Sequence, residues 1–138
     1  MNDVEYGPGD VQRIVDRSPF LSWMGLKIER LTDDEIEVLA TWRPEWVANP
    51  DRGQTQGGII GALIDFAANF AMFRKTGRPV LTVDLRIDYH RMAKKGDLLA
   101  KGKIIKLGKT VSAAEAHILD GEGRLVASGR GTFLTADS

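Results

Sequence analysis

The alternation of apolar and polar residues along the chain predicts that most of it forms β-strands. In residues 35–42, every second side chain is apolar, as in a strand with one buried face. Residues 80–91 alternate in the same way and place Leu81, Val83, Leu85, Ile87 and Tyr89 on one predicted face. The other predicted strands are residues 26–31, 98–107, 109–119 and 124–135.

One long helix is predicted among these strands, over residues 57–76. The segment is rich in Ala, Leu and Ile, and Gly77 follows two basic residues at its predicted C-terminus. Apolar residues cover its whole circumference, which is typical of a buried helix. A curved sheet wrapped around the helix would cover most of this surface, and a second copy of the chain would cover the rest.

The remaining segments are shorter. Residues 10–16 carry apolar residues at helical spacing, and Pro19 is expected to end that helix. Residues 43–55 contain two prolines and a glycine and are predicted to form a loop. Short turns between consecutive strands favour an antiparallel sheet. We therefore predict one α+β domain over residues 1–138, in which residues 1–18 form an N-terminal helical extension.

The composition argues against several classes of function. The chain has no cysteine, which excludes disulfides, thiolate catalysis and cysteine-ligated zinc. Nineteen basic and nineteen acidic residues cancel, so no net charge favours nucleic acid or an anionic membrane. The first residues lack the pattern of a signal peptide, which favours a cytoplasmic protein. The apolar run at residues 57–73 holds Asp65 near its middle and is not predicted to span a membrane.

Asp65 is the first candidate for chemistry, because it stands in an otherwise apolar helix. Between Gly58 and Arg74 the only other polar side chain is that of Asn69, four residues further on and on the same helix face. One interpretation is a structural acid, bonded to backbone donors or to a buried arginine. The other is a general base or nucleophile that works in a water-poor site.

The start of the same helix is the second candidate. Gln56, Gly57 and Gly58 precede the apolar run, and a helix N-terminus offers free N–H groups to a developing oxyanion. The two glycines alone could equally serve close packing. Gly57 and Asp65 are eight residues apart, or about 12 Å along a helix. One substrate carbonyl can reach both only if they come from different subunits, which predicts a dimer with shared sites.

Several segments together resemble hotdog-fold thioesterases of the phenylacetic-acid-degradation type. The family's core motif is an Asn, then His-Gly-Gly, then an apolar helix that reaches an Asp. The corresponding residues here are Asn49-Pro50, Gln56-Gly57-Gly58 and Asp65. Further agreement lies at Thr82-Val83-Asp84-Leu85, at residues 89–97, at Gly108-Lys109, and at the closing glycine-rich residues 121–132. The resemblance covers residues 19–135.

The resemblance implies a hotdog fold, in which an antiparallel β-sheet wraps around one long central α-helix, assembled as homodimers or homotetramers. It implies hydrolysis of an acyl-CoA thioester without a cofactor. Asp65 would act as nucleophile or general base, and the N–H of Gly57 from the partner subunit would bind the thioester oxygen. Asn49 would place the water or the carbonyl, and Thr82 would hydrogen-bond near Asp65.

Further residues are expected to contact the substrate. Gly58 and Asn69 lie on the same helix as Asp65, and Arg91, Lys94 and Lys95 would meet the phosphates of CoA. Ordinary solvated positions are the alternative for these basic residues. His90 and His117 are isolated in the sequence, so no metal site is predicted.

Gln56 is a departure from the family motif, because a histidine is usual there. Glutamine donates hydrogen bonds but does not carry a proton near neutral pH. A non-catalytic acyl-CoA-binding protein on the same fold is therefore the alternative to a thioesterase. A related hotdog dehydratase is less favoured, because neither histidine lies on the long helix or in the loop before it.

Overall fold

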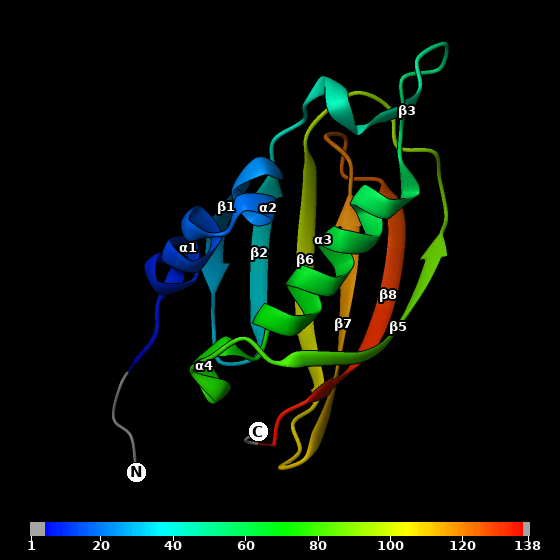
Figure 1. Ribbon diagram of the computed structural model, residues 1–138. Helices are drawn as coiled ribbons and strands as arrows, with labels where there is room; N and C mark the ends of the chain where they lie inside the picture. The colour runs from blue at the N-terminus through cyan, green and yellow to red at the C-terminus, as the bar shows by residue number, and fades with distance from the viewer. Residues whose placement is uncertain (1–4, 137–138) are drawn as a thin grey trace.

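The computed structural model describes residues 5–136, and its framework is a six-stranded antiparallel sheet with a long helix across one face (Figure 1). In spatial order the strands are β1 (Leu26–Leu31), β2 (Glu35–Ala40), β6 (Leu98–Lys106), β7 (Val111–Leu119), β8 (Leu125–Leu134) and β5 (Leu81–Tyr89). All six end within two residues of the bounds predicted from the sequence. The α+β class and the arrangement of a sheet around one long helix are confirmed.

Helix α3 (Gly57–Phe70) lies close against the sheet because small residues form the surface beneath it. A Cβ atom on Gly102 of β6 would stand 2.1 Å from the backbone oxygen of Ala67. A Cβ atom on Gly129 of β8 would stand 2.6 Å from the side chain of Ile64. The helix therefore rests on the backbone of the central strands, and its apolar side chains fill the space on either side.

The predicted helix over residues 57–76 is two helices, which corrects the sequence-based interpretation. α3 ends at Phe70, and a short helix α4 (Phe73–Thr76) follows after Ala71 and Met72. Gly77 ends α4 in the left-handed conformation with φ 69°, as expected of a C-terminal glycine. Both Ala71 and Met72 are fully buried, so the bend keeps the apolar run inside the molecule while the chain changes direction.

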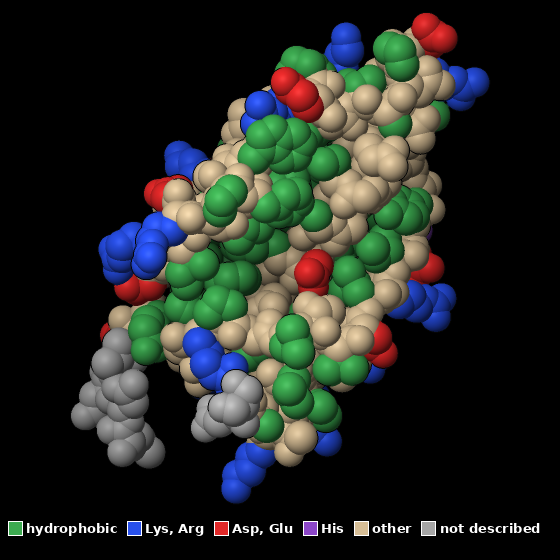
Figure 2. Space-filling model, in the orientation of Figure 1, with side chains coloured by type: hydrophobic (Ala, Val, Ile, Leu, Met, Phe, Trp, Pro, Cys, Tyr) green, Lys and Arg blue, Asp and Glu red, His purple; other side chains and the backbone are tan. Residues whose placement is uncertain are grey.

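The sheet leaves one stripe of α3 uncovered, the part of its surface for which a second copy of the chain is the expected cover. Gly58, Ala62, Asp65 and Asn69 form an open stripe, spaced four, three and four residues apart, and none of them is buried. Figure 2 shows hydrophobic side chains gathered over the middle of this face, with most charged side chains at its margins. The sheet covers only one side of the helix, and the open stripe lies on the side that the sheet does not cover.

Two short helices cover one edge of the sheet. α1 (Pro8–Arg17) was predicted at residues 10–16, and α2 (Pro19–Trp23) begins at the proline that was expected only to end α1. The side chain of Gln12 accepts a hydrogen bond from the Ile28 N–H at 2.9 Å and donates one to the Leu26 carbonyl at 3.0 Å. α1 thus satisfies backbone groups of β1, and this edge of the sheet is protected.

The opposite edge is open in the single chain. β5 pairs with β8 on one side, and no strand of residues 5–136 lies on its other side. Leu81, Val83 and Tyr89 on this strand are 69%, 59% and 52% exposed. An edge strand with exposed apolar side chains is a template for pairing with another chain.

The predicted loop at residues 43–55 contains regular structure, which is a further correction. A single 3-10 turn covers Pro44–Trp46, and β3 (Val47–Asn49) pairs with β4 (Gln54–Thr55) in a small separate hairpin. The hairpin delivers the chain directly to the first residue of α3, so its geometry fixes where the helix begins.

β5 carries a bulge that overturns the predicted faces of this strand. Thr82 pairs with Phe133 and Asp84 pairs with Thr132, so Val83 is an extra residue between two registers. Strict alternation would place Thr82 on the face opposite Leu85. With the bulge, Thr82 faces α3 together with the inward residues that follow it on β5.

Candidate functional site

Asp65 is half-buried in the middle of the open stripe. The hydroxyl of Thr82 donates a hydrogen bond to its Oδ1 atom at 2.7 Å. Within residues 5–136 no arginine, lysine or backbone N–H reaches the carboxylate. The interpretation of Asp65 as a structural acid required such partners. The carboxylate is instead held by one hydroxyl, and its Oδ2 atom has no hydrogen-bond partner among the described residues.

Asn69, one turn after Asp65, is engaged with the backbone. Its amide nitrogen donates to the Val80 carbonyl at 2.6 Å, and its oxygen accepts from the Val80 N–H at 3.2 Å. This pair of bonds ties the end of α3 to the residue before β5. Asn69 therefore positions β5, and Thr82 with it, relative to the carboxylate of Asp65.

The start of α3 has free backbone donors. Gln56 is the N-cap, and its side chain makes no capping hydrogen bond to the first turn. The N–H groups of Gly57 and Gly58 have no acceptor within the helix. The positive end of the helix dipole strengthens their attraction for a negatively charged group. The hydroxyl of Tyr89 donates to the Gly57 carbonyl at 2.7 Å and fixes the first turn against β5.

A groove of about 540 Å³ opens beside this helix start, and we call it the helix-start groove. Its lining consists of Gln54, Thr55, Gly57, Gly58, Ile60, Tyr89, His90, Arg91, Met92 and Ala93. Thr55 is 2% exposed, and its hydroxyl has no hydrogen-bond partner within the described residues. The groove thus combines the predicted oxyanion donors with a polar group that the sequence did not single out.

Asn49 lies at the end of β3, before the turn of the small hairpin. Its side-chain oxygen accepts a hydrogen bond from the Asp51 N–H at 3.0 Å. It does not line the helix-start groove within the single chain. Its amide NH₂ group remains available as a donor, since the described residues supply no acceptor for it.

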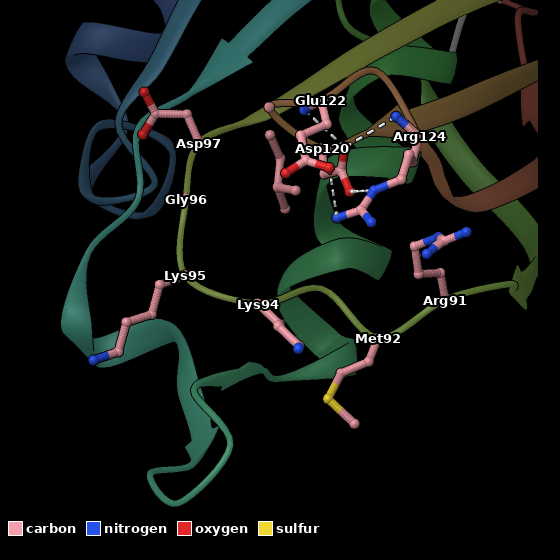
Figure 3. Close-up of a pocket in the computed structure, with 11 residues that line it drawn as sticks. Arg91, Met92, Lys94, Lys95, Gly96, Asp97, Asp120, Glu122 and Arg124 are labelled. Atoms are coloured by element: carbon pink, nitrogen blue, oxygen red, sulfur yellow. Dashed lines mark hydrogen bonds and ion pairs between the residues drawn. The ribbon is translucent and has the colours of Figure 1, made fainter.

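A second pocket, of about 400 Å³, gathers the predicted basic residues, and we call it the basic pocket (Figure 3). Arg91, Lys94 and Lys95 line it from one segment, and the stem of Lys95 also packs against Gly53. Arg124, from the turn between β7 and β8, contributes a fourth cation that the sequence did not indicate. The lining also includes three carboxylates, those of Asp97, Asp120 and Glu122, so an anion would have to bind on the side of the four cations.

Acidic residues stabilise the turn between β7 and β8 and reduce the positive charge of the basic pocket. Asp120 accepts from the Arg124 N–H at 2.9 Å and from its guanidinium at 2.9 Å. The backbone hydrogen bond from Arg124 lowers the pKa of Asp120, with a smaller contribution from the Glu122 N–H. Glu122 also contacts the Arg124 guanidinium at 3.3 Å. The acids therefore fix the position of Arg124 relative to Arg91 and Lys94.

The two hollows are neighbours, because Arg91 and Met92 line both of them. An extended molecule can therefore pass from the start of α3 to the basic pocket without leaving the surface of one chain. The described residues contain no cluster of His, Asp or Glu suited to a metal ion. No helix among residues 5–136 has the length and apolar character needed to cross a membrane.

Comparison with known proteins agrees with this architecture. The family model of the thioesterase superfamily matches residues 54–127, which include Asp65 and all lining residues of the helix-start groove and of the basic pocket. A candidate esterase of Halobacterium salinarum is 33% identical over 134 residues, covering 89% of this chain and 88% of its own. The medium/long-chain acyl-CoA thioesterase YigI of Escherichia coli is 22% identical over 138 residues, covering 89% of each chain.

Two solved structures extend the similarity to the fold. One is a protein from the thioesterase superfamily with 42% sequence identity and a TM-score of 0.89, covering 92% of this chain and 96% of its own. The other is a mutant of the phenylacetic acid degradation protein PaaI from Thermus thermophilus. It has 27% identity and a TM-score of 0.75, covering 85% of this chain and 98% of its own.

Proposed function

The chain belongs to the thioesterase superfamily and is a thioester hydrolase, and from this premise we propose that it hydrolyses acyl-CoA at sites shared by two copies of the chain. The observation that carries the proposal is the carboxylate of Asp65. It is the one acid on α3, it lies on the open stripe, and a hydroxyl at 2.7 Å fixes its orientation.

The attack on the thioester is assigned to Asp65. In one route its carboxylate takes a proton from water, and the resulting hydroxide adds to the carbonyl carbon before the C–S bond breaks. In the other route a carboxylate oxygen attacks directly and forms an acyl anhydride, which water then hydrolyses. Both routes release the acid and the thiol, and both place negative charge on the carbonyl oxygen.

The oxyanion is assigned to the start of α3, where the N–H of Gly57 is free. Backbone donors fixed in advance stabilise such charge without reorganisation. Because α3 is continuous from Gly57 to Asp65, these two residues stand about 12 Å apart in one chain. The proposed site therefore pairs Asp65 of one copy with Gly57 of its partner.

The open edge of β5 supplies a surface for that partner. A second copy that pairs along β5 would satisfy its free backbone groups and cover Leu81 and Val83. It would also bring a second set of α3 residues next to the open stripe. A homodimer is therefore the smallest assembly in which the proposed site is complete, and a tetramer would be two such dimers.

Acyl-CoA is the proposed substrate class because the basic pocket lies next to the helix-start groove. Arg91, Lys94 and Arg124 would bind phosphates, and the thioester would lie near Gly57. The similarity to YigI, named as a medium/long-chain acyl-CoA thioesterase, supports the same class. The proposed site needs no metal or cofactor for either route of attack.

The test is thiol release from short, medium, long and aryl acyl-CoA substrates, with wild type beside Asp65→Ala. We expect turnover by the wild type and a loss of about a hundredfold or more in the variant, with the oligomer intact. Saturable binding of acyl-CoA without thiol release by the wild type would contradict the proposal. A variant that kept most of the turnover would remove Asp65 from the mechanism.

A further inference from the structure

The hydroxyl of Thr55 is a buried polar group without a use in the fold. Thr55 is 2% exposed, and its Oγ1 atom has no hydrogen-bond partner within residues 5–136. The backbone at this position is satisfied separately, because the Thr55 N–H donates to the Ala93 carbonyl at 2.8 Å. Burial of an unpaired hydroxyl opposes folding, whereas valine has nearly the same shape without that cost.

The position of Thr55 connects it to the site. It lines the helix-start groove with Gly57 and Gly58, which follow it at the beginning of α3. Thr55 is the last residue of β4 and stands two residues before Gly57, the first residue of α3. A ligand in the groove therefore passes next to Thr55, whose hydroxyl is enclosed in the single chain and would turn toward the ligand by rotation about the Cα–Cβ bond.

The chemistry of the ligand follows from the neighbouring pocket. Phosphates in the basic pocket and a thioester at Gly57 must be joined across the helix-start groove, because Arg91 and Met92 line both hollows. In acyl-CoA the joining segment is the pantetheine arm, which carries two amides. A threonine hydroxyl donates to an amide carbonyl and accepts from an amide N–H, so it matches either group.

We infer that Thr55 is a substrate-binding residue whose hydroxyl bonds the amide of the pantetheine arm nearest the thioester. The inference rests on the proposed function for the identity of the ligand. The inference adds to the site a residue that is neither charged nor part of α3.

The experiment compares wild type, Thr55→Val and Thr55→Ser on three thioesters of one acyl group that the wild type turns over. The thiols are CoA, N-acetylcysteamine, which keeps the nearest amide, and ethanethiol, which has none. For the CoA and N-acetylcysteamine esters, we expect the KM of Thr55→Val to rise relative to wild type, and this rise to exceed that for the ethanethiol ester by about three- to tenfold. The kcat of the variant is expected to stay within about twofold of the wild-type value. Thr55→Ser keeps the hydroxyl and is expected to behave like wild type.

Two results would overturn the inference. Equal losses on all three esters would place the hydroxyl at the reacting carbonyl or in the fold, and a loss confined to acyl-CoA would place it on a more distant group. Thermal denaturation tests whether the hydroxyl stabilises the fold instead of binding substrate. Thr55→Val loses no protein hydrogen bond, so we expect the variant to be at least as stable as wild type.

A binding measurement keeps the inference independent of turnover. Calorimetric titration with CoA itself is expected to give a Kd about three- to tenfold higher for Thr55→Val than for wild type. If the wild type binds CoA but releases no thiol from acyl-CoA, the proposed function fails while the role of Thr55 is still measured. Equal Kd values for the two proteins would contradict the role of Thr55 alone.

Discussion

The hydroxyl of Thr82 donates a 2.7 Å hydrogen bond to the carboxylate of Asp65, and it reaches that carboxylate because Val83 is an extra residue in β5. Without the bulge, Thr82 would lie on the other face of the sheet from the inward residues of this strand. The bulge therefore links a local irregularity of an edge strand to the orientation of the proposed catalytic carboxylate. It also couples the chemistry to the strand on which the partner subunit is expected to pair.

Thr82→Val is expected to lower kcat by about tenfold, because the carboxylate loses the hydrogen bond that orients it. Thr82→Ser retains the hydroxyl and is the matched control. The measurement is thiol release under saturating acyl-CoA, together with thermal denaturation of each variant. A Val variant with wild-type kcat would show that the bond does not orient the carboxylate for catalysis.

The shared site is tested by mixing two inactive variants. Gly57→Pro removes the N–H donor, and proline is tolerated at the first position of a helix when the preceding residue is extended, as Gln56 is at ψ 133°. A heterodimer of Gly57→Pro with Asp65→Ala has one intact site if each site takes one residue from each chain. Half of the dimers in an evenly exchanged one-to-one mixture are heterodimers, so we expect mixing to restore up to about a quarter of the wild-type activity.

If both residues of a site came from one chain, every site in the mixture would carry a defect and no activity would return. The proline ring introduced by Gly57→Pro would meet the Tyr89 hydroxyl, since a Cβ at Gly57 lies 3.2 Å from it. Tyr89→Phe in both mixing partners relieves this contact and serves as the control background.

The proposed pairing along β5 is tested by Val83→Lys. Lysine on an edge strand opposes pairing with another strand, so we expect the variant to be largely monomeric and to lose most of its activity. Ile105→Lys is the control, because Ile105 is also exposed, at 44%, but lies on the interior strand β6. Sedimentation velocity measures the assembly. An active, dimeric Val83→Lys would exclude β5 as the interface.

Gly102→Ala is expected to destabilise the protein by about 2–3 kcal/mol, because the new Cβ would meet the backbone of α3. The nearest atom, the Ala67 oxygen, stands only 2.1 Å from that position. Gly121→Ala is the control, since nothing lies within 4 Å of a Cβ there and its φ is not positive. Urea unfolding compares the two variants, and equal stabilities would mean that α3 can move away from β6.

The stability of the turn at residues 120–124 is expected to depend on pH. The Arg124 N–H lowers the pKa of Asp120 below its ordinary value of 3.8, so folding favours the ionised carboxylate. This contribution is complete above the ordinary pKa and is lost as the pH falls through the lowered one. Asp120→Asn is therefore expected to lower the Tm at pH 7, with a difference from wild type that shrinks as the pH falls below 3.8. A difference in Tm between wild type and variant that grew on acidification would contradict a lowered pKa for Asp120.

The sequence indicates candidate residues for the site but does not describe their surroundings. Asp65 was identifiable because a lone carboxylate in an apolar helix is unusual, and the glycines at the helix start because that position exposes N–H groups. Thr55 and Arg124 were not identified. A threonine in a loop and an arginine in a turn carry no local signal, and their importance comes from residues far away in the chain.

The sequence by itself determined the succession of the six main strands along the chain, the start of the long helix and its apolar character, because these follow from local periodicity and from which side chains avoid water. Only the tertiary structure decided the bulge at Val83, the protected edge at β1, and the open edge at β5. It also decided that residues 91–98 and 120–124 share one pocket. These features depend on contacts between segments distant in sequence, and such contacts leave no repeat in the local pattern of apolar and polar residues.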